Sequence, residues 1–201
     1  MTTANKITIA RILAIPVFVA MAIYYGRGVQ TGHAEEWQRV AAILLFALAA
    51  VSDGLDGYIA RHYNQRTRLG LILDPIADKG LLLAGIITLT FSNWHYEFPL
   101  WFPILVISRD VVVVTGSLVL HYLNGKVQVR PSWVGKTATV LQMVSIAAAM
   151  LQVNRPGLPA EPPFSWMDGL VAAAGIFTFI SGIGYVLDGV RQLQAGEHAN
   201  A

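Results

Sequence analysis

The sequence predicts an all-α integral membrane protein with six transmembrane helices and with both termini in the cytoplasm. Of its 201 residues, 55% are hydrophobic and only 13% are charged, and the mean hydropathy is +0.54, which is typical of a chain that lies in lipid. Its apolar stretches are long enough to cross a bilayer, and its Lys and Arg residues are distributed unequally between the two sides. The chain has no Cys, which excludes disulfides and thiolate metal sites.

Six apolar stretches follow one another with polar connections between them, and they predict a single membrane domain over residues 1–201. The expected spans are residues 6–26, 37–61, 70–93, 99–123, 132–152 and 165–190. The Pro-rich segment 155–163 predicts a loop between the last two spans. We find no internal repeat that would divide the chain.

The first apolar stretch has a competing interpretation as a signal peptide. Lys6 and Arg11 precede an apolar run that contains the small-residue triplet A-M-A at residues 20–22. The run continues past this triplet to Tyr25, and the later spans keep their charge pattern only if the first one is retained. We therefore expect a retained transmembrane helix.

The distribution of Lys and Arg sets the expected orientation. With the N-terminus inside, eleven of the 14 Lys and Arg residues fall on the inner side, and only Arg27, Arg39 and Arg155 fall outside. This bias places both termini and the basic segment 61–68, which joins the second and third spans, in the cytoplasm. Basic inner loops favour the anionic lipids of that leaflet and anionic substrates.

Four carboxylates lie within 26 residues of this apolar chain, at Asp53, Asp56, Asp74 and Asp78. An unpaired carboxylate at membrane depth costs roughly 2.5–3.5 kcal/mol even on a lenient scale, so the charges need partners. The first two are three residues apart and the last two are four apart, so each pair shares one helix face. Two facing antiparallel helices would then form an acidic site for one or two hard divalent cations, Mg²⁺ or Mn²⁺.

These residues carry a family resemblance. They match the complete pattern D-x-x-D-G-x-x-A-R-x8-G-x-x-x-D-x-x-x-D, by which the chain resembles the CDP-alcohol phosphatidyltransferases. The matching positions are Asp53, Asp56, Gly57, Ala60, Arg61, Gly70, Asp74 and Asp78. Segments 5–11, 74–79 and 133–142 also resemble parts of the bacterial phosphatidylglycerophosphate synthases in this family, so the resemblance covers most of the chain.

The resemblance implies an enzyme that transfers a phosphatidyl group from CDP-diacylglycerol to an alcohol and releases CMP, with Mg²⁺ or Mn²⁺ as cofactor. It also implies a homodimer. The Lys and Arg distribution places both Asp pairs near the cytoplasmic ends of adjacent antiparallel helices, so we expect an active site that faces the cytoplasm from the inner membrane. By the same resemblance Asp78 binds metal and acts as the catalytic general base. The residues implied to bind the CDP group, directly or through metal, are Asp53, Asp56, Gly57, Ala60, Arg61, Gly70 and Asp74; the implied metal ligands are Asp53, Asp56, Asp74 and Asp78.

The sequence leaves several alternatives for the identity of the acceptor alcohol. Glycerol 3-phosphate needs a basic pocket, which Arg109, Arg130 and Lys136 could provide. Asp110, however, stands where the glycerophosphate-using pattern commonly has Glu, and no second Arg appears a turn or two later, in residues 111–120. This departure resembles the eukaryotic-type cardiolipin synthases, which use phosphatidylglycerol; inositol phosphate or serine is a further alternative.

Several polar residues also have plainer interpretations. Arg61 is expected either to hold phosphate or to extend to the membrane boundary as an ordinary helix-end charge. The residues Asn5, Thr8 and Arg11 share one helix face, which favours capping and anchoring, with a contribution of the first helix to substrate entry as the alternative. Because adjacent residues do not share a face, Arg109 and its neighbour are expected to have different partners. A cation transporter is a remote alternative for the acidic cluster as a whole.

Overall fold

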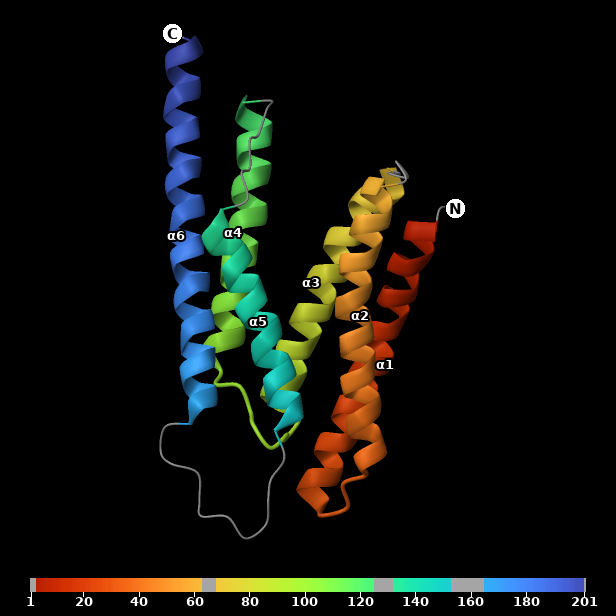
Figure 1. Ribbon diagram of the computed structural model, residues 1–201. Helices are drawn as coiled ribbons and strands as arrows, with labels where there is room; N and C mark the ends of the chain where they lie inside the picture. Colours follow the sequence, from red (N-terminus) through yellow and green to blue (C-terminus); the bar gives the residue numbers. More distant parts are fainter. Residues whose placement is uncertain (1–2, 63–67, 125–131, 153–164, 201) are drawn as a thin grey trace. The chain divides into compact units, whose positions relative to one another are not determined.

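The structure is a computed structural model in which all described secondary structure is α-helical (Figure 1). It describes the backbone at residues 3–62, 68–124, 132–152 and 165–200, and side chains at residues 5–52, 73–119, 122, 132–152 and 165–191. The helices are α1 (Thr3–Thr31), α2 (Glu36–His62), α3 (Arg68–Phe91), α4 (Trp101–Asn124), α5 (Trp133–Leu151) and α6 (Trp166–Asn200). Each expected span coincides with one of these helices, so the all-helical prediction is confirmed.

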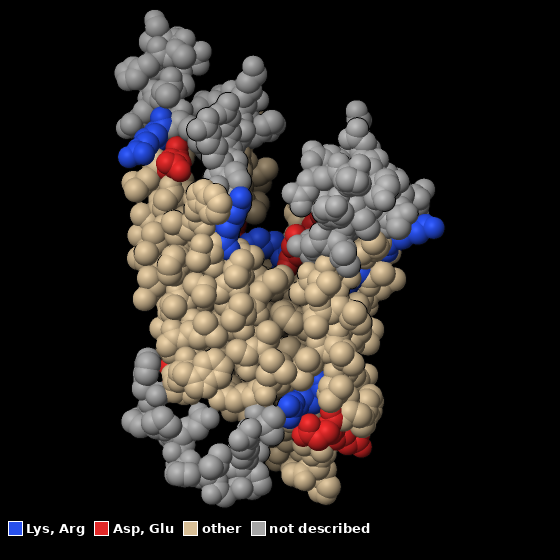
Figure 2. Space-filling view, viewed as in Figure 1, with Lys and Arg blue, Asp and Glu red and all other residues tan. Residues whose placement is uncertain are grey.

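Four segments in the described part of the chain are long and apolar enough to cross a membrane. They are Asn5–Thr31, Trp101–Val119, Trp133–Leu151 and Trp166–Arg191, and they lie in α1, α4, α5 and α6. In Figure 2 the visible surface has broad uncharged stretches, with charged side chains gathered in a few places. The protein is therefore a multi-pass membrane protein.

The chain forms two compact units. The first comprises Met1–Phe98 and Ile146–Pro159 and contains α1, α2, α3 and the end of α5. The second comprises Pro99–Ser145 and Ala160–Ala201 and contains α4, most of α5 and α6.

In the first unit, α1 packs along both α2 and α3. Phe18 of α1 is buried against Phe46 of α2, with ring centroids 5.8 Å apart. A Cβ atom on Gly85 of α3 would lie 3.1 Å from the side chain of Ile146, so the absence of a side chain at Gly85 lets α5 approach closely. Small residues at helix contacts are the usual means of close packing in membranes.

The loop that follows α3 closes over the end of α1. Asn93 has a positive φ of 49°, a conformation that Asn tolerates and that ends the helix. The Trp94 indole donates a 3.0 Å hydrogen bond to the Ala22 carbonyl, and the Tyr25 hydroxyl and His95 Nε2 share one of 3.1 Å. Burial, helped by the nearby Arg39 cation, lowers the pKa of His95, so this contact favours a neutral imidazole.

In the second unit, α4 and α6 pack along each other, and α5 joins them through polar contacts. The Trp101 ring of α4 lies against Gly175 of α6, where a Cβ would come within 2.6 Å of it. The buried Gln142 of α5 donates a 2.7 Å hydrogen bond to Thr178 of α6. Such interhelical hydrogen bonds stabilise membrane helices by about 0.6–2 kcal/mol each.

Two serines cap the helices of this unit. Ser132 accepts a 3.0 Å hydrogen bond from the Gly135 amide at the start of α5. Ser165 and Asp168 form a reciprocal pair at the start of α6, in which the Ser165 amide donates to the Asp168 carboxylate and the Asp168 amide donates to the Ser165 carbonyl. These caps fix where each helix begins and so which residues face α4.

The contact between α1 and the loop after α3 predicts that Gly26 tolerates no side chain. A Cβ there would lie 1.5 Å from the Ser92 carbonyl oxygen, a backbone atom that cannot turn aside. Gly26→Ala should lower the free energy of unfolding by about 3 kcal/mol, measured by thermal unfolding in detergent. Gly116→Ala, where a Cβ meets nothing within 4 Å, is the matched control and should be neutral or slightly stabilising. Equal stability of the two variants would contradict the close packing at Gly26.

Candidate active site

A polar face of α1 is buried in the first unit. Asn5, Thr8 and Arg11 are only 4%, 1% and 2% exposed, respectively. Their spacing of three residues puts them on one side of the helix. The expectation that they serve capping and anchoring is wrong for Thr8 and Arg11, because both are buried and both contact α3.

Each of these two residues donates to one carboxylate of α3. Thr8 Oγ1 donates to Asp74 Oδ1 at 2.8 Å, and Arg11 Nη1 donates to Asp78 Oδ1 at 2.6 Å. We call Asp74 and Asp78 the carboxylate pair. The four-residue spacing places both on one face of α3, which matches the three-residue spacing of their donors on α1. The helix packing therefore brings together residues 66 and 67 positions apart in the sequence.

Burial differs across the Arg11–Asp78 ion pair. The Arg11 side chain is 1% exposed, whereas the Asp78 side chain is 40% exposed. Asp74 is also partly exposed. A guanidinium buried this deeply needs an opposite charge, and Asp78 supplies it while keeping access to the medium. The carboxylate pair is thus anchored from one side and accessible from another.

The donor set of the carboxylate pair fits a hard divalent cation. A carboxylate offers two oxygens and about four lone pairs, so one accepted hydrogen bond leaves capacity to bind a metal. Oxygen ligands suit Mg²⁺ and Mn²⁺. Among the described side chains, however, no three residues of metal-binding type form a group, and the carboxylate pair supplies only two ligands.

The remaining residues of the predicted nucleotide and metal site lie outside the described side chains. Their backbone belongs to α2 and α3, as expected. They are Asp53, Asp56, Gly57, Ala60, Arg61 and Gly70. Of the predicted acceptor residues, Arg130 lies outside the described residues altogether.

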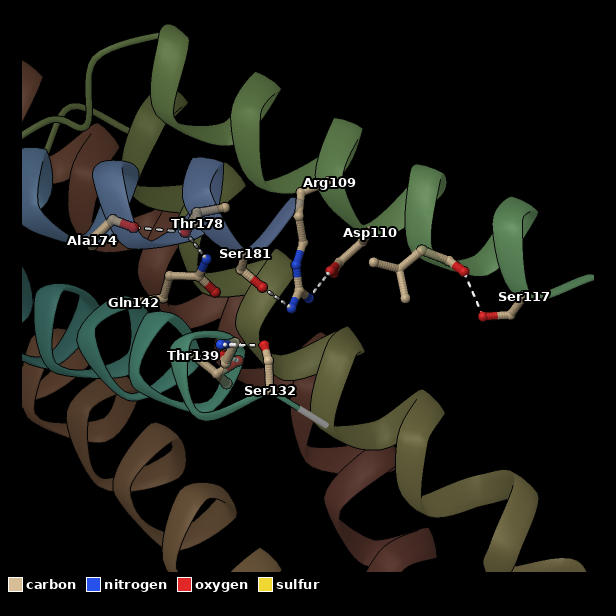
Figure 3. Close-up of polar contacts among 11 residues, drawn as sticks. Arg109, Asp110, Ser117, Ser132, Thr139, Gln142, Ala174, Thr178 and Ser181 are labelled. Atoms are coloured by element: carbon tan, nitrogen blue, oxygen red, sulfur yellow. Dashed lines mark hydrogen bonds and ion pairs between the residues drawn. The ribbon is translucent and has the colours of Figure 1, made fainter. Parts of the chain in front are cut away.

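Arg109 lies in the second unit, where three helices surround its guanidinium (Figure 3). It contacts the Asp110 carboxylate at 2.8 Å and the Ser181 hydroxyl at 3.0 Å, and it lies 5.2 Å from the Tyr185 ring centroid. The expectation that Arg109 and Asp110 have different partners is wrong, because they pair with each other. The long Arg side chain can turn toward its neighbour, and a partly buried cation is stabilised by the nearest opposite charge.

Lys136 begins the second turn of α5 and is exposed. Its ammonium lies 5.2 Å from the Trp133 ring centroid, a cation–π contact at the start of the helix. The preceding residue, Gly135, lies against the guanidinium of Arg109. The structure therefore places two of the three predicted acceptor cations in one unit, on adjacent helices.

The family model for CDP-alcohol phosphatidyltransferases matches residues 1–187. The chain belongs to this family. It is accordingly a phosphatidyltransferase, as the Asp-rich pattern predicted, and the transporter alternative is left without support.

Similar proteins are found in several bacteria. A protein from Mycobacterium tuberculosis strain H37Rv, named probable phosphatidylglycerophosphate synthase, is 33% identical over 191 residues, which cover 94% of this chain and 82% of that one. Proteins named CDP-diacylglycerol–glycerol-3-phosphate 3-phosphatidyltransferase from Escherichia coli K12 and Shigella flexneri serotype 5b are each 33% identical over 150 residues, covering 74% of this chain and 76% of theirs.

The contacts of the carboxylate pair predict a dual role for Arg11. Arg11→Ala should remove the ion pair between Arg11 and Asp78, and we expect a loss of about 1–3 kcal/mol in stability, less than for a fully buried pair because Asp78 is 40% exposed. Activity should fall further than stability explains, since the orientation of Asp78 is lost as well. Thermal unfolding and CMP release from CDP-diacylglycerol measure the two effects.

Lys6→Ala is the matched control for this experiment, because Lys6 lies on the same helix but is exposed. It should leave both quantities unchanged. An Arg11→Ala protein with full turnover would show that Asp78 does not depend on α1.

Proposed function

We propose that the protein transfers the phosphatidyl group of CDP-diacylglycerol to glycerol 3-phosphate, giving phosphatidylglycerophosphate and CMP. The reaction class follows from the family. Glycerol 3-phosphate is supported by the names of relatives that are 33% identical over most of this chain. The observation that carries the site is the carboxylate pair, held by Thr8 and Arg11.

In the proposed reaction Asp78 is the general base. It accepts the proton of the acceptor hydroxyl as that oxygen attacks the phosphorus of the phosphatidyl group, and the bond from phosphorus to the CMP oxygen breaks in the same in-line displacement. One proton is thus released for each CMP formed. Arg11 supports this role because it fixes one carboxylate oxygen at 2.6 Å and so sets the direction of the other.

The proposed metal ligands are Asp53, Asp56, Asp74 and Asp78, which would hold Mg²⁺ or Mn²⁺. When bound, such ions offset charge on the diphosphate and on the departing CMP. Thr8 holds Asp74 in place through its 2.8 Å hydrogen bond. The carboxylate is therefore already ordered before a metal binds, and it loses less conformational freedom on binding.

The CDP group is assigned to the remaining residues of the family pattern. Gly57, Ala60 and Gly70 are small, and they would leave room beside the carboxylates for the flat nucleotide. Arg61 would contact a phosphate. Asp53, Asp56 and Asp74 would bind the diphosphate through the metal.

The acceptor phosphate is assigned to Arg109, Arg130 and Lys136. Support comes from the second unit, where Lys136 follows directly on the glycine that lies against Arg109. A second candidate acceptor is phosphatidylglycerol, which would make the enzyme a cardiolipin synthase. The Arg109–Asp110 ion pair favours this alternative, because the compensated cation attracts the dianion of glycerol 3-phosphate less than an uncompensated one would.

We further propose six transmembrane spans in one domain over residues 1–201, with both termini and the active site on the cytoplasmic side of the inner membrane. The asymmetric distribution of Lys and Arg supports this orientation. It would present the water-soluble head of CDP-diacylglycerol to the carboxylates while the acyl chains stay in lipid. The family resemblance supports a homodimer.

The oxygen-only ligand set predicts a strict requirement for a divalent cation. EDTA should abolish CMP release, and added Mg²⁺ or Mn²⁺ should restore it. The measurement is CMP formation by purified protein with CDP-diacylglycerol and an acceptor. Full activity in a chelated, metal-free preparation would refute the metal assignment, as would restoration by Zn²⁺ alone.

The acceptor assignment predicts product from labelled glycerol 3-phosphate with no added lipid acceptor. Lys136→Ala should then raise the apparent KM for glycerol 3-phosphate by a factor of about 10 to 150, because a charge-assisted contact contributes roughly 1.5–3 kcal/mol, and should change the KM for CDP-diacylglycerol much less. Arg191→Ala, at an exposed site on α6, is the control. Product that forms only after phosphatidylglycerol is added would establish the cardiolipin synthase alternative instead.

A further inference from the structure

The guanidinium of Arg109 is held by residues from three helices, as Figure 3 shows in part. We call Arg109, Asp110, Gly135, Ser181 and Tyr185 the Arg109 cluster. Asp110 of α4 contacts Nη1, Ser181 of α6 contacts Nη2, and the Tyr185 ring of α6 lies 5.2 Å from Cζ. These contacts fix both the position and the plane of the guanidinium.

The backbone of α5 approaches the cluster at Gly135. A Cβ on Gly135 would lie 3.0 Å from Arg109 Nη2 and 3.0 Å from Ser181 Oγ. Both distances are shorter than ordinary van der Waals contact, so any larger residue must displace these two side chains by a few tenths of an ångström. Both are side-chain ends that can move, so the expected result is a shifted guanidinium in a folded protein.

This arrangement restrains Arg109 more than charge compensation requires. Asp110 alone would neutralise the cation, and an Arg in a membrane helix can otherwise extend to the boundary. Here the Arg109 side chain is 12% exposed, and its Nε finds no hydrogen-bond partner among the described residues. An Arg side chain also loses rotamer entropy when it is fixed. A geometry maintained against these costs indicates that the exact place of the guanidinium matters.

We propose that Gly135, Ser181 and Tyr185 are positioning residues, which hold the Arg109 guanidinium where it receives the phosphate of the acceptor alcohol. The proposal rests on the acceptor role assigned to Arg109 above. The ligand class is an alcohol that carries a phosphate group, either a soluble phosphomonoester or a phosphodiester lipid. None of the three positioning residues needs to touch the acceptor itself.

The competing explanation is that the Arg109 cluster only holds α4, α5 and α6 together. Under that explanation, substitutions would lower the stability and the amount of active protein, with the KM values of both substrates unchanged. Positioning instead predicts a selective rise in the KM for the acceptor. It also predicts that the effect of each substitution disappears once Arg109 itself is removed, since residues that act through a common partner are not additive.

The test uses the full-length purified protein with CDP-diacylglycerol and glycerol 3-phosphate, and both KM values are measured. Gly135→Ala and Ser181→Ala should each raise the acceptor KM by about three- to thirtyfold, with the donor KM within about twofold. Matched controls are Gly184→Ala, where a Cβ meets no described atom within 4 Å, and Ser117→Ala, whose hydroxyl donates to the Val113 carbonyl of its own helix. Both controls should behave as the unmodified protein.

The same two substitutions are then repeated in an Arg109→Ala background. Positioning is supported if they no longer change the acceptor KM there. It is overturned if they change it equally in both backgrounds, if the donor KM rises instead, or if only the melting temperature falls.

Failure of the proposed function gives a different pattern. Without transfer to glycerol 3-phosphate, the acceptor assignment is wrong, and the series is run with phosphatidylglycerol, whose phosphodiester is the other ligand named above. If Arg109→Ala leaves the KM of the working acceptor unchanged, both the role of Arg109 and the positioning proposal are overturned.

Discussion

The first unit depends on the hydrogen bonds that two buried donors of α1 make to carboxylates of α3. Acidic residues in a helix of this apolar chain are costly unless partners face them, and Thr8 and Arg11 supply those partners at hydrogen-bond distance. The pairing sets the register between α1 and α3, because a rotation or a slide of one residue would bury a guanidinium without its carboxylate. At the other end of α1, the Trp94 indole and the close approach of Gly26 to Ser92 fix the same register. Polar contacts at both ends thus align an apolar interface that has little directional preference of its own.

The second unit uses the same principle in a different form. Its partly buried cation is compensated by the adjacent residue of the same helix, and the other helices contribute a hydroxyl, an aromatic ring and a bare backbone. Gln142 and Thr178 add a buried polar pair further along α5 and α6. In each unit, therefore, helices that lipid alone would leave free to rotate are oriented by a few satisfied polar groups. Under the proposed function, the stability and the chemistry of the protein depend on the same side chains.

The sequence allowed the helices to be predicted because apolar length is a strong signal, and each expected span coincides with one helix. It also indicated that Asp74 and Asp78 share a face, since this needs only the helical period.

The partners of the polar residues were not predictable in the same way. A three-residue spacing showed that Thr8 and Arg11 share a side of α1 but not what that side meets, and this depends on the packing of α1 against α3. The Arg109–Asp110 pair was missed because face geometry was considered without the reach of the Arg side chain. Ser181 and Tyr185 carried no signal, since an isolated Ser or Tyr in a membrane helix is common.

Charge compensation in the resting protein has a consequence for substrate binding. Asp78 is paired with Arg11 and Arg109 with Asp110 in the structure. Under the proposed function, a ligand that binds at either residue therefore meets a charge that is already compensated. Binding then exchanges or extends existing ion pairs, and the net affinity is the difference between the new contacts and those they weaken. Such a site favours ligands that match its geometry over ligands that only carry the complementary charge. A misplaced anion would weaken an existing ion pair without forming an equivalent contact of its own. Under the proposed function, selection between a phosphomonoester and a phosphodiester acceptor would accordingly depend on how the Asp110 carboxylate and the bound phosphate share the guanidinium donors of Arg109.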